Sequence, residues 1–375
     1  MAVGSVTVVQ VDNLQGDFSA AERVFLFIGK NAVPDHDNEI IPIDAASDLD
    51  EVLAPGESEL KTMIAAARSN AASDNFACYA LPVGTGTDWK EALYSALDKP
   101  LDLDVEAVVL CTPVKTKLEV EACQVAANEV LSRFAKFVCI FAGCAGIDAK
   151  TETWAKYLEK VGALVDNVNC DRVVLVPQLH GNNLGVIAGR LCNPAASLAD
   201  SPMRVATGAL VGLGADPVDS AKAPLNMATI KALAALRLSV PQWYAGYPGM
   251  FWADHALLAA EGSDFSVYEN RRVLDYLARR VRVLAIGKIA DRRLNNTPRS
   301  IAIHKTFFAE PLREASRDIE VAGVTMPGLI YPPADNAIGI VWNSRTNVSI
   351  SITARPYECP KTITMYLGLD LSNLN

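Results

Sequence analysis

Apolar and polar residues alternate with a period of two near the C-terminal end of the chain. This pattern occurs in residues 347–353 and again in residues 361–371. Because successive side chains of a β-strand point to opposite faces, each run predicts a strand with one apolar face. The apolar positions are Val348, Ile350 and Ile352 in the first run, and Ile363, Met365, Leu367, Leu369 and Leu371 in the second.

A similar strand-like run lies near the N-terminus, at residues 5–11, where Val6, Val8, Val9 and Val11 supply the apolar positions. A strand close to each end of a long chain can pair within its own chain or add itself to the sheet of another copy. The two terminal strands therefore indicate a chain that links copies into a polymer, which points away from an enzyme.

The first half of the chain predicts a largely parallel sheet covered by helices. The apolar run 23–29 is typical of a strand in the middle of a sheet, and a loop rich in Asp, Asn and Pro follows it at residues 31–57. Strands that alternate with helices of about ten residues form βαβ units. Helices are predicted at 59–72, 89–97, 118–134 and 152–161, and strands at 76–83, 107–111, 137–142 and 172–177.

The second half changes character after residue 184. Two Ala-rich helical stretches, 184–191 and 225–236, lie in a segment where we place a domain transition. A long helix at 270–293 and a helical region at 301–316 then precede the C-terminal strands. We therefore expect an α/β domain at residues 21–240, an α+β domain at 241–360, and strand arms at 1–20 and 361–375.

Composition narrows the class of protein. The chain has 375 residues, of which 50% are hydrophobic, so there is ample material for packed cores. A net charge of −9 argues against a general nucleic-acid binder, which needs a basic surface. We find no run of 18 to 20 apolar residues that would span a membrane and no signal-peptide pattern, so we expect assembly in the cytoplasm and no membrane insertion.

The residues that usually hold metals are scattered. None of the eight cysteines forms a CxxC pair, and the four histidines are widely separated in the chain. Several cysteines lie inside apolar runs and are expected to be buried, reduced thiols. We therefore predict no metal and no cofactor.

Three loops at strand ends keep an enzyme open as the alternative. Gly84 lies in a Gly-Thr-Gly loop before a helix, Gly143 precedes Cys144, and His180 follows the strand that ends near Pro177. Such positions suit a small ligand, but the phosphate-loop motifs are incomplete, and tight turns and capping elements are the favoured explanation of these residues. The acidic pairs Asp48/Asp50 and Asp102/Asp104 lie in polar, turn-like stretches typical of a solvated surface.

The predicted helix at 270–293 carries a basic stripe. At about 100° per residue, Arg272, Arg279, Arg282 and Arg293 fall within roughly a quarter of the circumference, opposite an apolar face. On an acidic protein this stripe fits an acidic partner surface. It fits a solvated helix face with local ion pairs equally well.

Three consecutive segments of the second half resemble the signature of contractile-tail sheath proteins. They are a Trp-containing segment at 249–255, a linker at 264–268, and the helix that begins Glu-Asn-Arg-Arg at residue 269. The β-rich C-terminus and the N-terminal strand resemble that family too, in particular the short sheath proteins of Mu-like prophages. The chain departs from the family pattern at Asp254-His255, where Arg-Thr is frequent.

The resemblance implies a structural subunit of stacked hexameric rings around a tail tube, without catalytic residues. Terminal strands of neighbouring copies would complete the sheet of each C-terminal domain, which would lie inside, with the α/β domain outside and the basic helix facing the tube. The implied partners are further copies, the tail tube protein, and baseplate and tail terminator proteins, in a virion tail assembled in the bacterial cytoplasm. Another phage structural component, such as a baseplate or tube protein, is a further alternative, although tube proteins are shorter and richer in β-structure.

Overall fold

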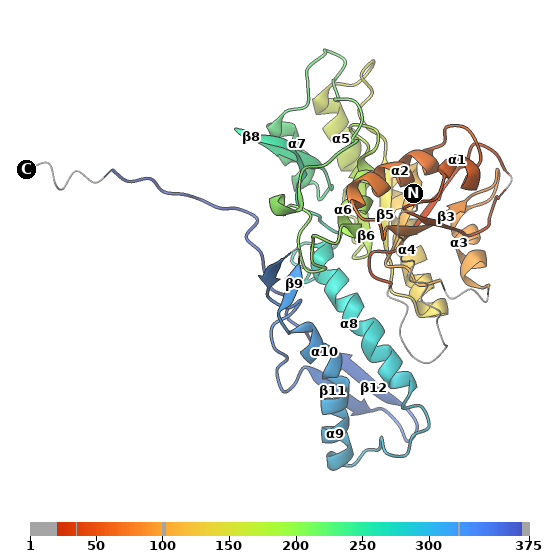
Figure 1. Ribbon diagram of the computed structural model, residues 1–375, viewed down its shortest axis with the longest axis vertical. Helices are drawn as coiled ribbons and strands as arrows, with labels where there is room; N and C mark the ends of the chain where they lie inside the picture. Colours follow the sequence, from red (N-terminus) through yellow and green to blue (C-terminus); the bar gives the residue numbers. More distant parts are fainter. Residues whose placement is uncertain (1–20, 35, 100–102, 322, 370–375) are drawn as a thin grey trace, which may run out of the picture.

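A six-stranded sheet forms the centre of the first half of the molecule. The computed structural model describes residues 21–34, 36–99, 103–321 and 323–369 (Figure 1). The spatial order of the strands is β2-β3-β1-β4-β5-β6; β2 is antiparallel to β3, and the other neighbouring pairs are parallel. The strands are β1 (Phe25–Gly29), β2 (Ile41–Asp44), β3 (Ala77–Pro82), β4 (Ala107–Val114), β5 (Cys139–Cys144) and β6 (Val173–Pro177).

Both faces of this sheet are covered by helices. Leu26 and Ile28 of β1 point into one core, and Phe25 and Phe27 point into the other, as the period of a strand requires. Parallel strands buried on both faces are nearly continuous in apolar residues, which explains the run 23–29. One face packs on α2 (Glu59–Ala71) and α6 (Asn183–Cys192), and the other on α3 (Trp89–Leu97), α4 (Lys117–Phe134), α5 (Trp154–Val165) and α7 (Met227–Ala235).

Local sequence signals fix where these helices begin. Ser58, Thr116 and Thr153 cap α2, α4 and α5 by accepting a hydrogen bond from a backbone N–H of the first turn. Helices α2 and α6 approach closely because Gly185 and Gly189 lie at their contact, where an added Cβ would collide with the backbone of α2.

The second half adds a smaller unit with a core of its own. Helix α8 (Tyr268–Ile286) starts against the large sheet and runs away from it toward the lower end of the view (Figure 1). Val273 and Leu277 of α8 pack with Phe308, Leu312 and Ile338 in a separate apolar cluster. The remaining elements here are α9 (Pro298–Phe308), α10 (Glu310–Ala315), and the two-stranded sheets β9 (Ile319–Val321) with β10 (Val324–Met326) and β11 (Ile338–Trp342) with β12 (Val348–Ile352).

Short elements fill the remaining stretches. The long loop after β1 contains β2 and helix α1 (Leu49–Val52) in addition to its turns. In the sequence between β6 and α8 there are also a 3-10 turn (Val205–Thr207) and an antiparallel pair of strands, β7 (Pro241–Tyr244) and β8 (Tyr247–Trp252).

The predicted fold class is confirmed: the first half is an α/β unit with a largely parallel sheet, and the second half adds helices and small sheets. The predicted helix at 270–293 is too long, because α8 ends at Ile286 and Ala290 adopts a left-handed backbone conformation (φ 61°) that a continuing helix excludes. The transition between the units spans residues 193–267 without a sharp boundary, so the division at residue 240 stays a prediction.

Candidate assembly surfaces

The C-terminal arm is an extended segment that projects from the body of the molecule (Figure 1). Within its described part, residues 361–369, no strand pairing occurs, so the predicted final strand is unpaired in the single chain. Ile363, Met365, Leu367 and Leu369 are 77% to 98% exposed. The arm is thus an extended segment whose apolar side chains, at alternate positions, are exposed to solvent.

Leu371 lies outside the described residues, and so do Val6, Val8, Val9 and Val11 at the N-terminus.

The sheet formed by β11 and β12 has one covered face and open edges. Ile338 and Ile340 of β11 are buried, and Val348, Ile350 and Ile352 of β12 are half-buried against the same core. The register pairs Ile338 with Ile352 and Trp342 with Val348. Within the described part of the chain each of the two strands has a partner on one side, so unpaired backbone groups remain along both outer edges.

The basic stripe of α8 is mainly an internal interface, which corrects the expectation that Arg272 and Arg279 face a partner. Arg272 is 3% exposed and donates from Nη2 to Glu106 Oε2 (2.9 Å) and to the Leu191 carbonyl (3.0 Å). Arg279 donates to Glu22 Oε1 from both Nε (3.1 Å) and Nη2 (2.9 Å). These acids belong to the α/β unit, so the arginines attach α8 to it.

Two further ion pairs extend this interface, which we call the α8 joint. Arg172, directly before β6, makes a bidentate contact with Asp275 of α8, at 2.8 and 3.0 Å. Arg271 donates to Asp171 at 3.3 Å. The α8 joint therefore consists of the acid–arginine pairs Glu22–Arg279, Glu106–Arg272, Asp171–Arg271 and Arg172–Asp275.

The buried Glu106 is ionised at the centre of this joint. Burial alone would raise the pKa of its carboxyl group, but the Arg272 guanidinium, the Arg23 backbone N–H and the Tyr268 hydroxyl hold that pKa below its usual value. The Tyr268 hydroxyl donates to Glu106 Oε1 at 2.5 Å. Both oxygens of this buried carboxylate accept hydrogen bonds from groups of the same chain. The Glu106–Arg272 ion pair therefore has a structural role.

Two residues of the predicted stripe remain at the surface. Arg282 is exposed on α8. Arg293 lies in the turns that follow the helix, contrary to the prediction that it belongs to the same helix face, and it pairs with Asp291 at 2.8 Å.

The family of this protein follows from its similarity to known proteins. A model of the DUF2586 N-terminal domain matches residues 3–256, and one of the DUF2586 C-terminal domain matches residues 264–372. A tail sheath protein of Haemophilus phage HP1 (strain HP1c1) is 38% identical over 379 aligned positions, which cover 99% of each chain. The chain belongs to the tail sheath proteins of the DUF2586 family.

Solved structures show the same fold at low sequence identity. The helical sheath of the anti-feeding prophage in its contracted state is 13% identical, with a TM-score of 0.59 over 97% of this chain and all of that one. Sheath tail proteins of Listeria innocua (9% identical, TM-score 0.58, covering 90% of this chain and 93% of that one) and Desulfitobacterium hafniense (10%, 0.52, 93% and 96%) also match. The predicted function is confirmed: this is a structural subunit of a contractile tail sheath and a component of a virion tail.

The strand-end loops of this sheath subunit carry structural side chains. Burial raises the pKa of the Cys144 thiol to about 12, so it is not a ready nucleophile. His180 is buried, and desolvation lowers its pKa; its backbone N–H donates to Asn183 Oδ1 at 2.8 Å, which makes it part of the turn before α6. Gly84 packs against the side chain of Asp37 in a tight turn. Asp48 caps α1, Asp104 pairs with Lys136, and Asp102 lies outside the described residues.

Sequence reasoning missed a buried Ser–His pair. Ser239 Oγ lies 2.6 Å from His255 Nδ1 and accepts a hydrogen bond from Trp252 Nε1 at 2.8 Å. All three side chains are 0% exposed, and the His255 ring stacks on Phe141 with 5.1 Å between ring centroids. A substrate has no access to this pair, so it serves the packing of the core.

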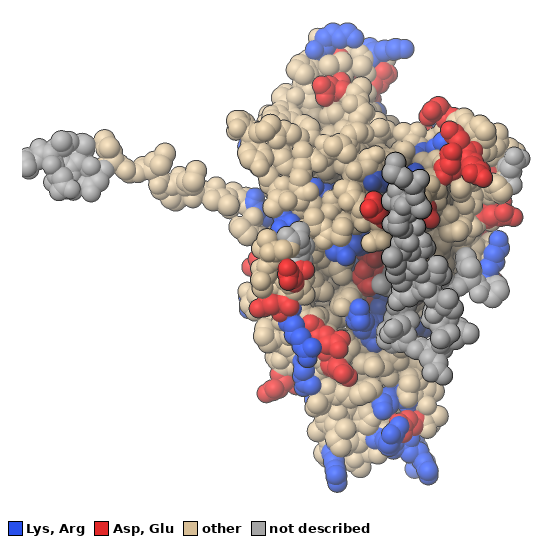
Figure 2. Space-filling view, viewed as in Figure 1, with Lys and Arg blue, Asp and Glu red and all other residues tan. Residues whose placement is uncertain are grey.

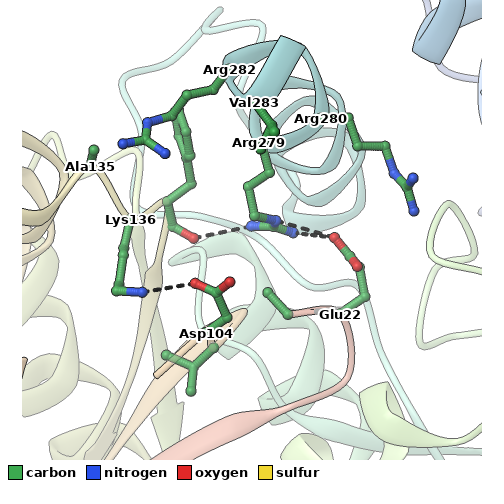
Figure 3. A pocket seen from close by; sticks show the side chains of 11 residues that line it. Glu22, Asp104, Ala135, Lys136, Arg279, Arg280, Arg282 and Val283 are labelled. Carbon is green, nitrogen blue, oxygen red and sulfur yellow. Dashed lines mark hydrogen bonds and ion pairs between the residues drawn. The ribbon is translucent and has the colours of Figure 1, made fainter. Parts of the chain in front are cut away.

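A small pocket of about 90 Å³ lies between α8 and the sheet (Figure 3). Arg279 reaches across it to Glu22 and to the Phe137 carbonyl, while Lys136 pairs with Asp104 at 2.8 Å on the opposite wall. The pocket is thus a gap beside the α8 joint, lined by the ion pairs Glu22–Arg279 and Asp104–Lys136 and by Arg280 and Arg282. Among the described residues no group of three or more His, Cys, Asp and Glu side chains is placed to hold a metal, and no helix is long and apolar enough to cross a membrane.

Proposed function

We propose that this sheath subunit forms stacked hexameric rings around a tail tube, and that terminal strands of each copy complete the β11–β12 sheet of a neighbour. The observation that carries the proposal is the exposed C-terminal arm in a molecule that also offers an open-edged sheet. Each exposed Ile, Met or Leu that becomes buried contributes about 1.5–3 kcal/mol, and the main-chain hydrogen bonds add register and direction. Four such side chains are enough to offset a large part of the cost of association.

Exchanged strands that link rigid subunits would also allow the sheath to contract. The α8 joint fixes the α/β unit and the C-terminal unit to each other, while the arm leaves the body as a single extended strand. Subunits connected through strands can rotate relative to one another without breaking the connection, so an extended packing can convert to a compact one along the whole polymer. That transition would drive the tube through the host envelope.

The tube contact is proposed at the far end of the C-terminal unit. We call residues 286–303 the tip; they comprise the turns after α8 and the first half of α9, and basic side chains gather at this end of the molecule (Figure 2). Arg292, Arg293 and Arg299 are exposed there, and the apolar side chains of Ile289 and Ile303 are 76% and 56% exposed. A basic rim with apolar residues suits an acidic tube surface, and many weak ion pairs can release together.

The same proposal includes baseplate and tail terminator proteins at the ends of the polymer, and assembly in the cytoplasm of the bacterial host. It assigns the subunit no enzymatic activity, cofactor or metal. The catalytic alternative at Gly84, Gly143 and His180 has no support in the geometry, because Gly84 and His180 belong to satisfied turns and Gly143 is a buried residue of β5.

The proposal is tested by charging one face of the arm. Met365→Asp places a carboxylate on the apolar face, and Thr364→Asp places the same charge on the opposite face. We expect negative-stain microscopy of the first variant to show discrete particles, and of the second to show hollow tubes. Tubes from both variants would contradict strand exchange.

A further inference from the structure

The chain is attached to the body at two points before the arm begins. The first point is a short antiparallel contact in which the Tyr331 backbone N–H donates to the Arg355 carbonyl at 2.8 Å, and the rings of Tyr331 and Tyr357 lie 4.0 Å apart. Residues 358–360 are then exposed. The second point is Lys361.

Lys361 lies in a notch between two acids of other elements. Its Nζ is 2.5 Å from Asp254 Oδ1, which follows β8, and 2.8 Å from Glu269 Oε1, in the first turn of α8. The Glu269 side chain is 7% exposed and Lys361 is 28% exposed, whereas Asp254 remains at the surface with 39%. A buried carboxylate is held by a lysine that belongs to the root of the arm.

The pKa values of Glu269 and Lys361 are set by burial and by this contact. Burial raises the pKa of Glu269, but Lys361 opposes the shift by stabilising the carboxylate. Burial alone would lower the pKa of Lys361, and the two acids reverse this and raise it. Lys361 therefore remains charged, and its removal would leave Glu269 with an unpaired buried oxygen in addition to Oε2, which has no hydrogen-bond partner.

The exposure changes abruptly beyond this residue. Thr362 and all later described residues are exposed, and the apolar ones are at least 77% exposed. Lys361 is thus the last residue of the described chain that makes an ion pair with its own body, although Ile363 still lines a shallow pocket beside Arg204 and Met326.

We infer that Lys361 is a positioning residue for strand exchange: by its ion pairs with Glu269 and Asp254 it fixes where the arm leaves the subunit and how far it reaches. The inference rests on the proposed function of the arm. Without Lys361 the last ion pair or ring contact with the body moves back to Tyr357, which lengthens the segment held by no such contact by four residues, or about 13 Å when extended. A longer free segment lowers the effective concentration of the strand at its neighbour's sheet and lets it reach a wrong neighbour.

The test measures the arm in the subunit itself, before any assembly. Spin labels are placed at Tyr366→Cys on the arm and Val125→Cys on α4, both exposed positions, in a Cys359→Ser background, because Cys359 is exposed while the other seven cysteines are buried. Labelled chains are diluted into unlabelled ones, and the distance distribution between the labels is recorded by pulsed electron spin resonance. Lys361→Gln should broaden this distribution at least twofold, whereas Lys361→Arg and the exposed Lys156→Gln should leave it narrow.

A second variant separates positioning from folding. Glu269→Gln combined with Lys361→Gln leaves no unpaired buried charge on α8, so this double variant should fold and still show the broad distribution. An unchanged distribution in folded Lys361→Gln or in the double variant overturns the inference. A broadened distribution in a chain whose Met365→Asp variant still forms tubes would support the anchor and contradict strand exchange, so the two failures are distinguishable.

Discussion

The α8 joint and the C-terminal arm differ in the burial and pairing of their side chains. In the joint, Arg172, Arg272 and Glu106 are nearly fully buried, and their charged atoms meet partners within the same chain. In the arm, large apolar side chains point into solvent without a partner in the same chain. In a single subunit the charged groups of the joint are therefore paired, whereas the apolar side chains of the arm are not buried. This difference is expected of a rigid body that is linked to other copies by strands.

The largest effect should follow from an apolar position of the arm. Leu367→Asp replaces a side chain that is 98% exposed in the single chain, so the free energy of unfolding of the subunit should change by less than about 0.5 kcal/mol. Polymer formation should nevertheless be lost, because the charge would be buried in a neighbour's sheet. Sedimentation and thermal unfolding of the same preparation measure both quantities, and Thr362→Asp is the matched control.

A large effect of the opposite kind should follow from the joint. Arg272→Ala leaves the buried Glu106 unpaired and should lower the free energy of unfolding by about 3–5 kcal/mol. Arg282→Ala, at an exposed residue of the same helix without an ion pair among the described contacts, should change it by less than about 0.5 kcal/mol. Urea unfolding gives both values, and equal values for the two variants would show that the buried pair does not hold the joint.

An intermediate effect should appear in the dependence of stability on pH. Burial, with smaller contributions from Lys361 and Arg272, lowers the pKa of His255 from 6.5 to about 3. Below pH 6.5 the unfolded chain binds a proton that the folded chain does not, so stability falls as the pH is lowered from 6.5 toward 3, by at most about 1.4 kcal/mol per pH unit.

The measurement compares urea unfolding at pH 7 and pH 4. His255→Asn should reduce the loss of stability between these two pH values by about 3 kcal/mol. His36→Asn, at an exposed position, should leave the loss as in the parent chain. A His255→Asn variant with the parent's pH dependence would contradict the assignment.

The smallest effect is expected at the tip. Arg292→Glu with Arg299→Glu removes two exposed positive charges, and each exposed pair contributes about 0–1 kcal/mol. Co-sedimentation with tubes should weaken by up to about tenfold at low salt, with less difference from the parent at high salt. Lys150→Glu with Lys156→Glu, at exposed positions in and beside α5, should leave tube binding unchanged.

Local patterns predicted what depends on local physics. Strands β1 and β12 correspond to the apolar run 23–29 and the alternation in 347–353, and α2 to α5 correspond to the predicted helices of the first half. These elements could be predicted because the period of apolar residues and the capping residues are properties of neighbouring positions in the sequence. The end of α8 was missed because the charge pattern continues to Arg293, whereas the chain turns at residues 287–290 and Ala290 is left-handed.

The partners of the arginine stripe could not be predicted in the same way. Arg279 pairs with Glu22, 257 positions away, and Arg272 pairs with Glu106, 166 positions away. A helical projection shows that charges share a face but not whether another element covers it. The pairing of Lys361 with Glu269 and Asp254 was missed for the same reason, because no periodic signal connects these residues.

The most direct test of the account is a cryo-electron microscopy map of tubes assembled from the full chain. We predict continuous density in which residues 362–371 of one subunit run along an open edge of the β11–β12 sheet of another, with the α8 joint unchanged within each subunit. An arm that instead lies on its own subunit, or a β11–β12 sheet that remains two-stranded in the polymer, would contradict strand exchange as the basis of assembly.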